Sequence, residues 1–220
     1  LTRISKYNEK ELVAWGAQAG EVLRNFDMAD TCRDIANRIT DAVKRGYDKG
    51  CNSIESHPPF AHQVHSLHLP IRKVTEDDYR KAVIDVKAVK NEFNSEKQMT
   101  GADLVAIFEP MGVISRYHQQ MEKDYVDVMM RSIRIGTAAI ITCPFELFVE
   151  YSFRIKARAV SKQTIVVQLT DQSYGYLPTH AAIHGGSYSS APASTTCGPA
   201  CGDILVDAAV QAIASLWNCR

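Results

Sequence analysis

The sequence predicts an α/β fold: a mixed β-sheet with flanking helices. Apolar residues recur at three- and four-residue steps through long stretches of the first 130 residues, which is the spacing of amphipathic helices. Between residues 132 and 169 the pattern changes to two short strands, a helix and a strand of β-branched residues. A helical crossover of about a dozen residues is the length that two parallel strands need, so this order predicts a β-α-β unit.

The composition is that of a folded globule without net charge. Hydrophobic residues make up 45% and charged residues 23% of the 220 residues, which excludes a wholly disordered chain. At about 150 residues per domain, this length predicts one large domain or part of one. The 25 lysines and arginines balance 25 aspartates and glutamates, so no net charge favours nucleic acid or an anionic membrane as a partner.

The sequence contains no clear membrane or targeting segment. No apolar run approaches the roughly 18 to 20 residues that cross a bilayer, so we expect a soluble chain without a transmembrane segment. The chain opens at Leu1 with no methionine and no leader, as a processed or truncated chain does. Its compartment and oligomeric state stay open, with a secreted or periplasmic location among the alternatives.

The individual elements follow from periodicity and from helix-capping residues. In chain order we expect two helices within residues 2–50, a strand over 64–71, a helix from Thr75, an irregular helix over 102–123, a hairpin of two strands over 132–142, a helix over 146–157, a strand over 164–169 and a helix capped by Asp203. Three acids follow Thr75, which is typical of an N-cap and a first helical turn. Pro110 and Gly112 interrupt the helical spacing around them. The strand over 164–169 is almost continuously apolar, which predicts burial on both faces.

Two polar turns follow neighbouring strands of the predicted β-α-β unit. Glu146 comes just after the hairpin, and Tyr174 and Tyr176 come just after the strand over 164–169. The carboxyl ends of strands form the ligand edge of an open α/β sheet, so these side chains are candidates for one shared pocket. The simpler interpretations are that Glu146 is an acid in the first turn of a helix and that the two tyrosines pack in a Gly/Pro turn.

Several short motifs around these turns resemble one known family. They are Pro144-x-Glu146-x-Phe148, the run Tyr-Gly-Tyr-Leu-Pro-Thr at 174–179 and Gly-Gly-Ser-Tyr at 185–188, placed between a strand pair and a terminal helix. In this order they resemble the C-terminal half of the catalytic domain of the neutral/alkaline non-lysosomal ceramidases and their shorter bacterial relatives. The resemblance is best from residue 131 to the end.

The resemblance also implies a domain organisation. The chain is then a single domain or the C-terminal half of a ceramidase-like catalytic domain, which would be a larger domain of two halves. Residues 1–130 are expected to be mainly helical with one or two strands. Residues 131–220 are expected to form the β-α-β core, with a long functional loop over 171–202 and a terminal helix.

The activity that the resemblance implies is zinc-dependent hydrolysis of the amide of an N-acyl sphingoid base or a related lipid amide. Glu146 and Tyr176 are then metal ligands, and three histidine ligands are expected outside this chain. Tyr174 is the less favoured candidate for the tyrosine ligand. Together with His180 and His184, it is assigned to substrate binding or to contact with the metal ligands. Bound Zn²⁺ polarises a substrate carbonyl and lowers the pKa of the attacking water. Catalytic residues stay unassigned, and a catalytically inactive ceramidase-like binding or structural module of unknown ligand is the alternative.

The other histidines offer weaker alternatives for a metal site. His180 and His184 have the four-residue spacing of helical metal ligands but no acid between them, so plain surface residues are the alternative there. His65 and His68 are three residues apart on a predicted strand. That spacing directs the two side chains to opposite faces, so we do not expect the pair to chelate one ion.

The six cysteines are too few and too scattered for a disulfide scaffold. Cys197 and Cys201 are separated by Gly-Pro-Ala, which can bring the two sulfurs within disulfide reach. A disulfide, half of a metal site and two free thiols remain the alternatives for this pair. Cys143 is expected to be a small buried hydrophobic residue.

We expect the 220 residues alone to show no zinc-dependent amidase activity, because the resemblance assigns them only part of the metal site. The measurement is release of fatty acid from an N-acyl sphingoid base by the purified chain with and without Zn²⁺. Turnover that depends on Zn²⁺ would contradict this expectation.

Overall fold

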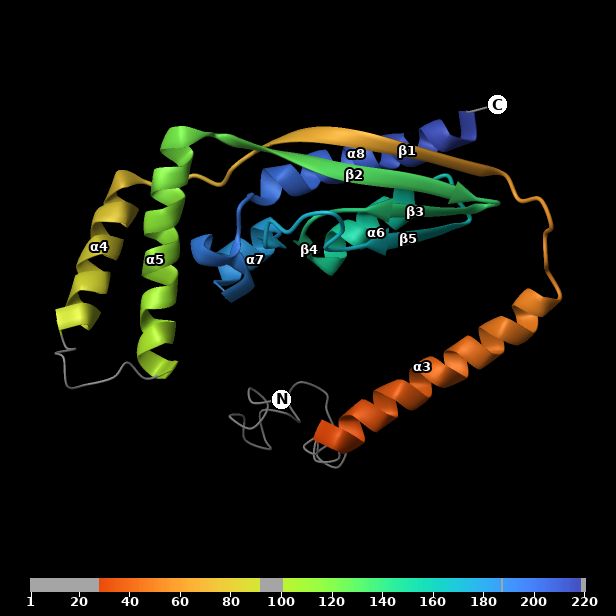
Figure 1. The fold of residues 1–220 in the computed structure, drawn as a ribbon, viewed down its shortest axis with the longest axis horizontal. Helices are drawn as coiled ribbons and strands as arrows, with labels where there is room; N and C mark the ends of the chain where they lie inside the picture. The colour runs from red at the N-terminus through yellow and green to blue at the C-terminus, as the bar shows by residue number, and fades with distance from the viewer. Residues whose placement is uncertain (1–27, 92–100, 187, 219–220) are drawn as a thin grey trace. The chain divides into compact units, whose positions relative to one another are not determined.

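The computed structural model describes residues 28–91, 101–186 and 188–218. Contacts divide the chain into two units, Leu1–His57 and Pro58–Arg220, and each is described by itself. Figure 1 shows the helices and strands of both units. The first of the two helices expected within residues 2–50 lies outside the described residues.

The first unit contains helix α3, Met28–Cys51, which confirms the second expected helix of that region. Apolar side chains recur at every fourth position along it. These side chains are exposed: Ile35, Ile39, Val43 and Tyr47. The helix is therefore amphipathic, with an apolar stripe and a charged remainder.

The second unit is built on a four-stranded sheet in the order β1-β2-β3-β5. Its strands are β1 (Phe60–Pro70), β2 (Tyr125–Ile135), β3 (Ala138–Thr142) and β5 (Gln163–Val167). The pairs β1–β2 and β2–β3 are antiparallel, whereas β3 and β5 are parallel. Helix α6 (Val149–Arg158) connects the two parallel strands. The predicted β-α-β unit and the α/β class, a mixed sheet with flanking helices, are confirmed.

The hairpin between β2 and β3 forms where the sequence predicts it. Ile135 pairs with Ala138 across a turn at Gly136 and Thr137. Gly136 has a φ of 59°, in the left-handed region that two-residue hairpin turns use and that glycine adopts without strain. β2 starts earlier than expected, because residues from Tyr125 onward pair with the end of β1.

Helices α6 and α8 (Pro199–Asn218) cover the same face of this sheet (Figure 1). α8 contacts β1, β2 and β3, and α6 contacts both β5 and α8. Between helices and sheet lies a core that includes Leu69, Val128, Ile141, Tyr151, Ile155, Leu205 and Ile213. The strand register places on the opposite face the exposed apolar side chains Phe60, Val64, Met129, Ile135, Ile165 and Val167.

The expectation that residues 164–169 are buried on both faces is wrong. β5 is an edge strand, and only its inner face meets α6. Thr164 is 8% exposed, whereas Ile165 and Val167 are 44% and 39% exposed. A continuous apolar run is typical of a strand with helices on both faces of its sheet. Here α6 and α8 lie on the same face of the sheet.

Helices α4 (Glu76–Asn91) and α5 (Gly101–Glu122) pack against each other between β1 and β2 in the chain. Thr75 caps α4 as predicted. The Asp78 N–H donates to Thr75 Oγ1 (3.1 Å), and the Thr75 N–H donates to Asp78 Oδ2 (3.0 Å). This reciprocal pair is a capping box, with an acid as its second member.

α5 is one continuous helix, so the predicted interruption at Pro110 and Gly112 is wrong. Proline removes one helical hydrogen bond, and the packing of α5 on α4 and on the 3₁₀ turn η3 (Pro192–Ser194) outweighs that loss. Gly112 has a packing role instead. A Cβ added there would lie 2.2 Å from the Cβ of Ala193, so only glycine allows η3 to approach the helix this closely.

Two boundaries near the predicted turns also differ from expectation. Glu146–Leu147 is a short strand, β4, so α6 begins at Val149 rather than at Glu146. β4 pairs in parallel with β6 (Tyr176–Leu177), from the long loop. α8 begins at Pro199, which places Asp203 inside the helix rather than at its N-cap. Pro at the first helical position needs no N–H partner, which explains the earlier start.

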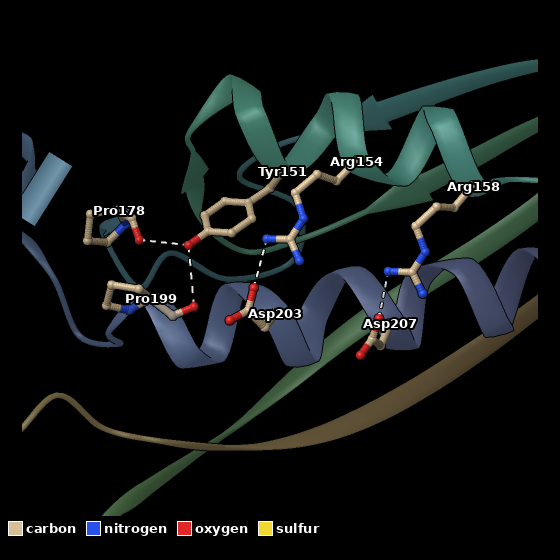
Figure 2. Close-up of polar contacts among 7 residues, drawn as sticks. All are labelled: Tyr151, Arg154, Arg158, Pro178, Pro199, Asp203 and Asp207. Carbon is tan, nitrogen blue, oxygen red and sulfur yellow. Dashed lines mark hydrogen bonds and ion pairs between the residues drawn. The ribbon is translucent and has the colours of Figure 1, made fainter. Parts of the chain in front are cut away.

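Tyr151 of α6 is the main polar contact between α6, α8 and the long loop (Figure 2). It is buried, and its hydroxyl donates to the carbonyl of Pro178 (2.8 Å) with the carbonyl of Pro199 also within reach (3.3 Å). Burial, with the nearby Asp203 carboxylate, raises the pKa of Tyr151 to about 12. The hydroxyl therefore keeps its proton, and its donor role, across the physiological pH range.

Two ion pairs line the exposed side of the same contact (Figure 2). Arg154 bonds Asp203 and Arg158 bonds Asp207, each at 2.7 Å. The two arginines and the two aspartates are each one helical turn apart, so the pairs align α6 with α8. Exposed pairs of this kind contribute about 1 kcal/mol or less each, so they set the alignment more than the stability.

α8 is long and apolar enough to cross a membrane, judged by length and composition alone. In this structure its buried residues, including Leu205, Val206, Ala209 and Ile213, belong to the core over the sheet. This is the arrangement of a core helix in a globular unit. The described residues therefore establish no firm transmembrane span.

Gly202 tests the α6–α8 contact. A Cβ added at Gly202 would lie 2.1 Å from Cζ of Tyr151. We expect Gly202→Ala to lower the free energy of unfolding by about 1–3 kcal/mol through overpacking, although alanine favours helices. The measurement is urea unfolding followed by circular dichroism. Gly46→Ala on α3 is the control, because nothing lies within 4 Å of its added Cβ; a stabilised Gly202→Ala variant would contradict the contact.

Candidate functional site

The candidate site lies where β4 and β6 pair in parallel, with Glu146 directly opposite Tyr176. Three successive backbone N–H groups of this segment donate hydrogen bonds to other segments of the chain. The Glu146 N–H donates to the Gly175 carbonyl (3.0 Å), and the Leu147 N–H donates to Oε1 of Gln168 (2.9 Å). The Phe148 N–H donates to the Leu177 carbonyl. The short strand is thus anchored although it has only two residues.

The side chains of Glu146 and Tyr176 meet in one environment. The Glu146 carboxylate lies close enough to the Tyr176 hydroxyl to hold the pKa of Tyr176 above its usual value. Hydrogen bonding to the carboxylate stabilises the protonated phenol, and the negative charge of Glu146 disfavours the phenolate beside it. Both residues are half-buried. The strand register therefore places the two residues side by side, and their role as ligands of one pocket stays a prediction.

The flanking residues leave the pair little freedom. Phe145, Leu147 and Leu177 are buried in the core on either side of the two functional side chains. Gly175, which precedes Tyr176, has a φ of 72°, and a Cβ there would lie 2.4 Å from the carbonyl oxygen of Ser194. Only glycine fits that position, so the Tyr-Gly-Tyr run positions the second tyrosine through its glycine.

Tyr188 extends the site toward an apolar groove. Its ring meets the Tyr176 ring edge-on, with centroids 6.1 Å apart, and stacks on Phe108 of α5 at 5.6 Å. The groove has a volume of about 650 Å³ and is lined by Leu104, Ala106, Phe108, Glu109, Pro110 and Tyr188. Sequence reasoning included Tyr188 in the Gly-Gly-Ser-Tyr motif but gave it no role; its place in that motif was the available signal.

Tyr174 does not join the pair. Its hydroxyl donates to the backbone carbonyl of Asp127 on β2 (3.2 Å), and its ring packs near Phe145. Glu146 is paired with Tyr176 and not with Tyr174, as the favoured register expects. Whether Tyr174 contacts a substrate stays a prediction.

His180 and His184 lie on the short helix α7 (His180–Gly185). Thr179 caps it, because its Oγ1 accepts from the Ala182 N–H (3.2 Å). The four-residue spacing is therefore helical, as predicted. Both imidazoles are exposed, and in the described part of the chain neither has a hydrogen bond to Glu146 or Tyr176.

The described residues contain no complete metal site. Within them no group of three or more His, Cys, Asp or Glu side chains could hold a metal ion. Glu146 and Tyr176 together offer a carboxylate and a phenol oxygen, and carboxylate oxygens are among the ligands of zinc. A metal ion held by this pair would need further ligands beyond the described residues.

The histidines of β1 behave as their spacing predicts. His65 bonds Ser132 Oγ (2.9 Å) beneath α8, and His68 bonds Asp127 Oδ1 (2.8 Å) on the exposed side. Alternate faces of one strand therefore separate the two imidazoles. Cys143 is buried, which raises the pKa of its thiol and fits the predicted role of a small core residue.

Comparison of the chain with protein-family models, curated proteins and solved structures gave no match. The family resemblance therefore rests on the motif residues themselves. The geometry of Glu146, Tyr176 and Tyr188 is independent of that resemblance, since it follows from strand pairing and ring contacts.

The pKa of Tyr176 tests whether its phenol interacts with the Glu146 carboxylate. We expect Glu146→Gln to lower the pKa of Tyr176 toward its usual value, because a neutral amide no longer opposes the phenolate. Ionisation of Tyr176 should therefore begin at lower pH in the variant. The measurement is the ultraviolet absorbance of tyrosinate during an alkaline titration, with Tyr176→Phe subtracted to isolate this residue. An unchanged Tyr176 titration would show that the two groups are not coupled.

Proposed function

We propose that this chain contributes Glu146 and Tyr176 to the metal site of a zinc-dependent hydrolase that cleaves a lipid amide, as in the ceramidase-like family that its motifs resemble. The observation that carries the proposal is the register of β4 and β6. It places a carboxylate and a phenol, thirty residues apart in the chain, directly opposite each other, and the carboxylate raises the pKa of the phenol.

The two side chains suit a cation because a carboxylate lies beside a phenol that keeps its proton. Glu146 and Tyr176 would hold a divalent cation as oxygen ligands, and its binding would require loss of the phenol proton. The phenol must be deprotonated to act as a ligand, so metal affinity of the pair rises with pH. Bound zinc would supply polarisation of the substrate carbonyl and a more acidic water.

The groove beside Tyr188 supports a substrate with a hydrocarbon chain. Five of its six lining residues are apolar or aromatic, and Glu109 is the exception. Tyr188 lies between this groove and the Tyr176 ring, so a chain in the groove would lead toward the Glu146–Tyr176 pair. Burial of each methylene group contributes about 0.8 kcal/mol, which favours long acyl or sphingoid chains over short polar amides.

The proposal is tested by zinc content in the protein at its natural length. We expect Glu146→Gln and Tyr176→Phe to weaken zinc binding at least tenfold, because each removes one oxygen ligand. Tyr174→Phe is the matched control, since its hydroxyl bonds a backbone carbonyl and not the pair. Zinc is measured by elemental analysis after dialysis against graded chelator, and folding is checked by circular dichroism.

Equal zinc affinity in Glu146→Gln and the unsubstituted protein would overturn the ligand assignment. The enzyme and the inactive module are separated by a second measurement, release of fatty acid from an N-acyl sphingoid base by the zinc-loaded protein. The enzyme proposal requires release that disappears with Glu146→Gln. Binding of the lipid without release identifies the binding module.

A further inference from the structure

Cys197 and Cys201 lie in contact beneath the N-terminal end of α8. Both are free thiols, and they are 0% and 1% exposed. Cys197 forms an isolated β-bridge with Ile71, just after β1, and Cys201 lies in the first turn of α8. The thiol of Cys201 donates to the carbonyl of Pro70 (3.0 Å), the residue next to Ile71, so both cysteines adjoin the end of β1.

The two thiols are chemically unequal. The hydrogen bond from Cys197 stabilises a thiolate on Cys201 and lowers its pKa, whereas the pKa of Cys197 is raised. A position in the first turn of a helix also favours a thiolate. Cys143 provides the contrast within the same unit, because it is also buried and burial raises the pKa of its thiol.

The backbone already has the turn that a bond between the two sulfurs needs. The Cys201 N–H donates to the Gly198 carbonyl (3.0 Å), which closes the chain between the cysteines. The four-residue separation, this turn and the shared neighbours Pro70 and Ile71 keep the two side chains close to each other, as a disulfide requires. Ala200, between the two cysteines, is exposed, so the pair lies just below the surface.

We propose that Cys197 and Cys201 are a reversible dithiol–disulfide site. The disulfide would link the loop segment that bridges Ile71 to the first turn of α8. The oxidant is a low-molecular-weight disulfide such as oxidised glutathione. The Cys201 thiolate attacks it, forms a mixed disulfide and releases one glutathione thiolate. Cys197 then loses its proton to solvent, attacks the Cys201 sulfur and releases the second glutathione. Two protein thiols are oxidised, and one glutathione disulfide is reduced to two thiols.

The test uses the full chain with Cys32, Cys51 and Cys219 replaced by serine, so that these three cannot compete. The protein is equilibrated in glutathione buffers from fully reducing to fully oxidising, then alkylated and cleaved before aspartate. This releases Asp171–Gly202, which contains Cys197 and Cys201 and no other cysteine. Equilibrium is approached twice, from the reduced native protein and from protein refolded under oxidising conditions, so that burial of the thiols does not decide the outcome.

We expect the Asp171–Gly202 fragment to lose the mass of two hydrogen atoms and its reactivity with alkylating agent as the buffer becomes oxidising, and to recover both with dithiothreitol. Cys143 should remain alkylatable after unfolding throughout. In Cys197→Ser, Cys201 should be trapped as a glutathione adduct at least tenfold faster than Cys197 is in Cys201→Ser. Thiols that stay reduced from both starting points, or a stable glutathione adduct in place of the internal bond, would overturn the proposal.

Discussion

The buried hydroxyl of Tyr151 joins the segments that carry the candidate site. Tyr151 belongs to α6, which begins two residues after Leu147 of β4, and its hydroxyl bonds the carbonyl of Pro178, directly after β6. The carbonyl of Pro199, at the start of α8, lies within reach of the same hydroxyl. Because one donor serves the chain on both sides of the β4–β6 pair, the register of Glu146 and Tyr176 depends on how α6 packs. Gly202 allows that packing, since a larger residue would collide with the Tyr151 ring.

The chemistry of the Glu146–Tyr176 pair follows from the raised pKa of the phenol. A half-buried phenol beside a carboxylate loses its proton less readily, and a cation that binds both oxygens must displace it. Two oxygen donors alone are fewer than the three protein ligands typical of catalytic zinc. In the proposed function the pair is therefore one part of the metal site, and Tyr188 connects the pair to the apolar groove.

Helices cover the sheet on one face only. This explains where the core lies and why the prediction that β5 is buried on both faces is wrong. α6 and α8 lie on the same side, so Leu69, Ile141 and Leu205 are buried together, while Ile165 of β5 is exposed on the other side. An exposed apolar face of this kind is unusual on an isolated globular unit. Apolar β-branched residues indicate a strand, but their pattern does not say whether a second layer covers it.

The sequence by itself determined most of the helices, the β2–β3 hairpin and the parallel pairing of β3 with β5, because helix spacing, the Thr75 cap, the turn at Gly136 and the length of the crossover are local properties. It also singled out Glu146, Tyr174 and Tyr176, through the turns that follow two neighbouring strands, and the family resemblance favoured Tyr176 over Tyr174. Only the tertiary structure decided that Glu146 lies on a strand rather than in a helix, that Pro110 sits in a continuous α5, and that Tyr188 adjoins Tyr176. These features depend on contacts between residues far apart in the chain, whose packing outweighs the local preference of a proline or of a first-turn acid.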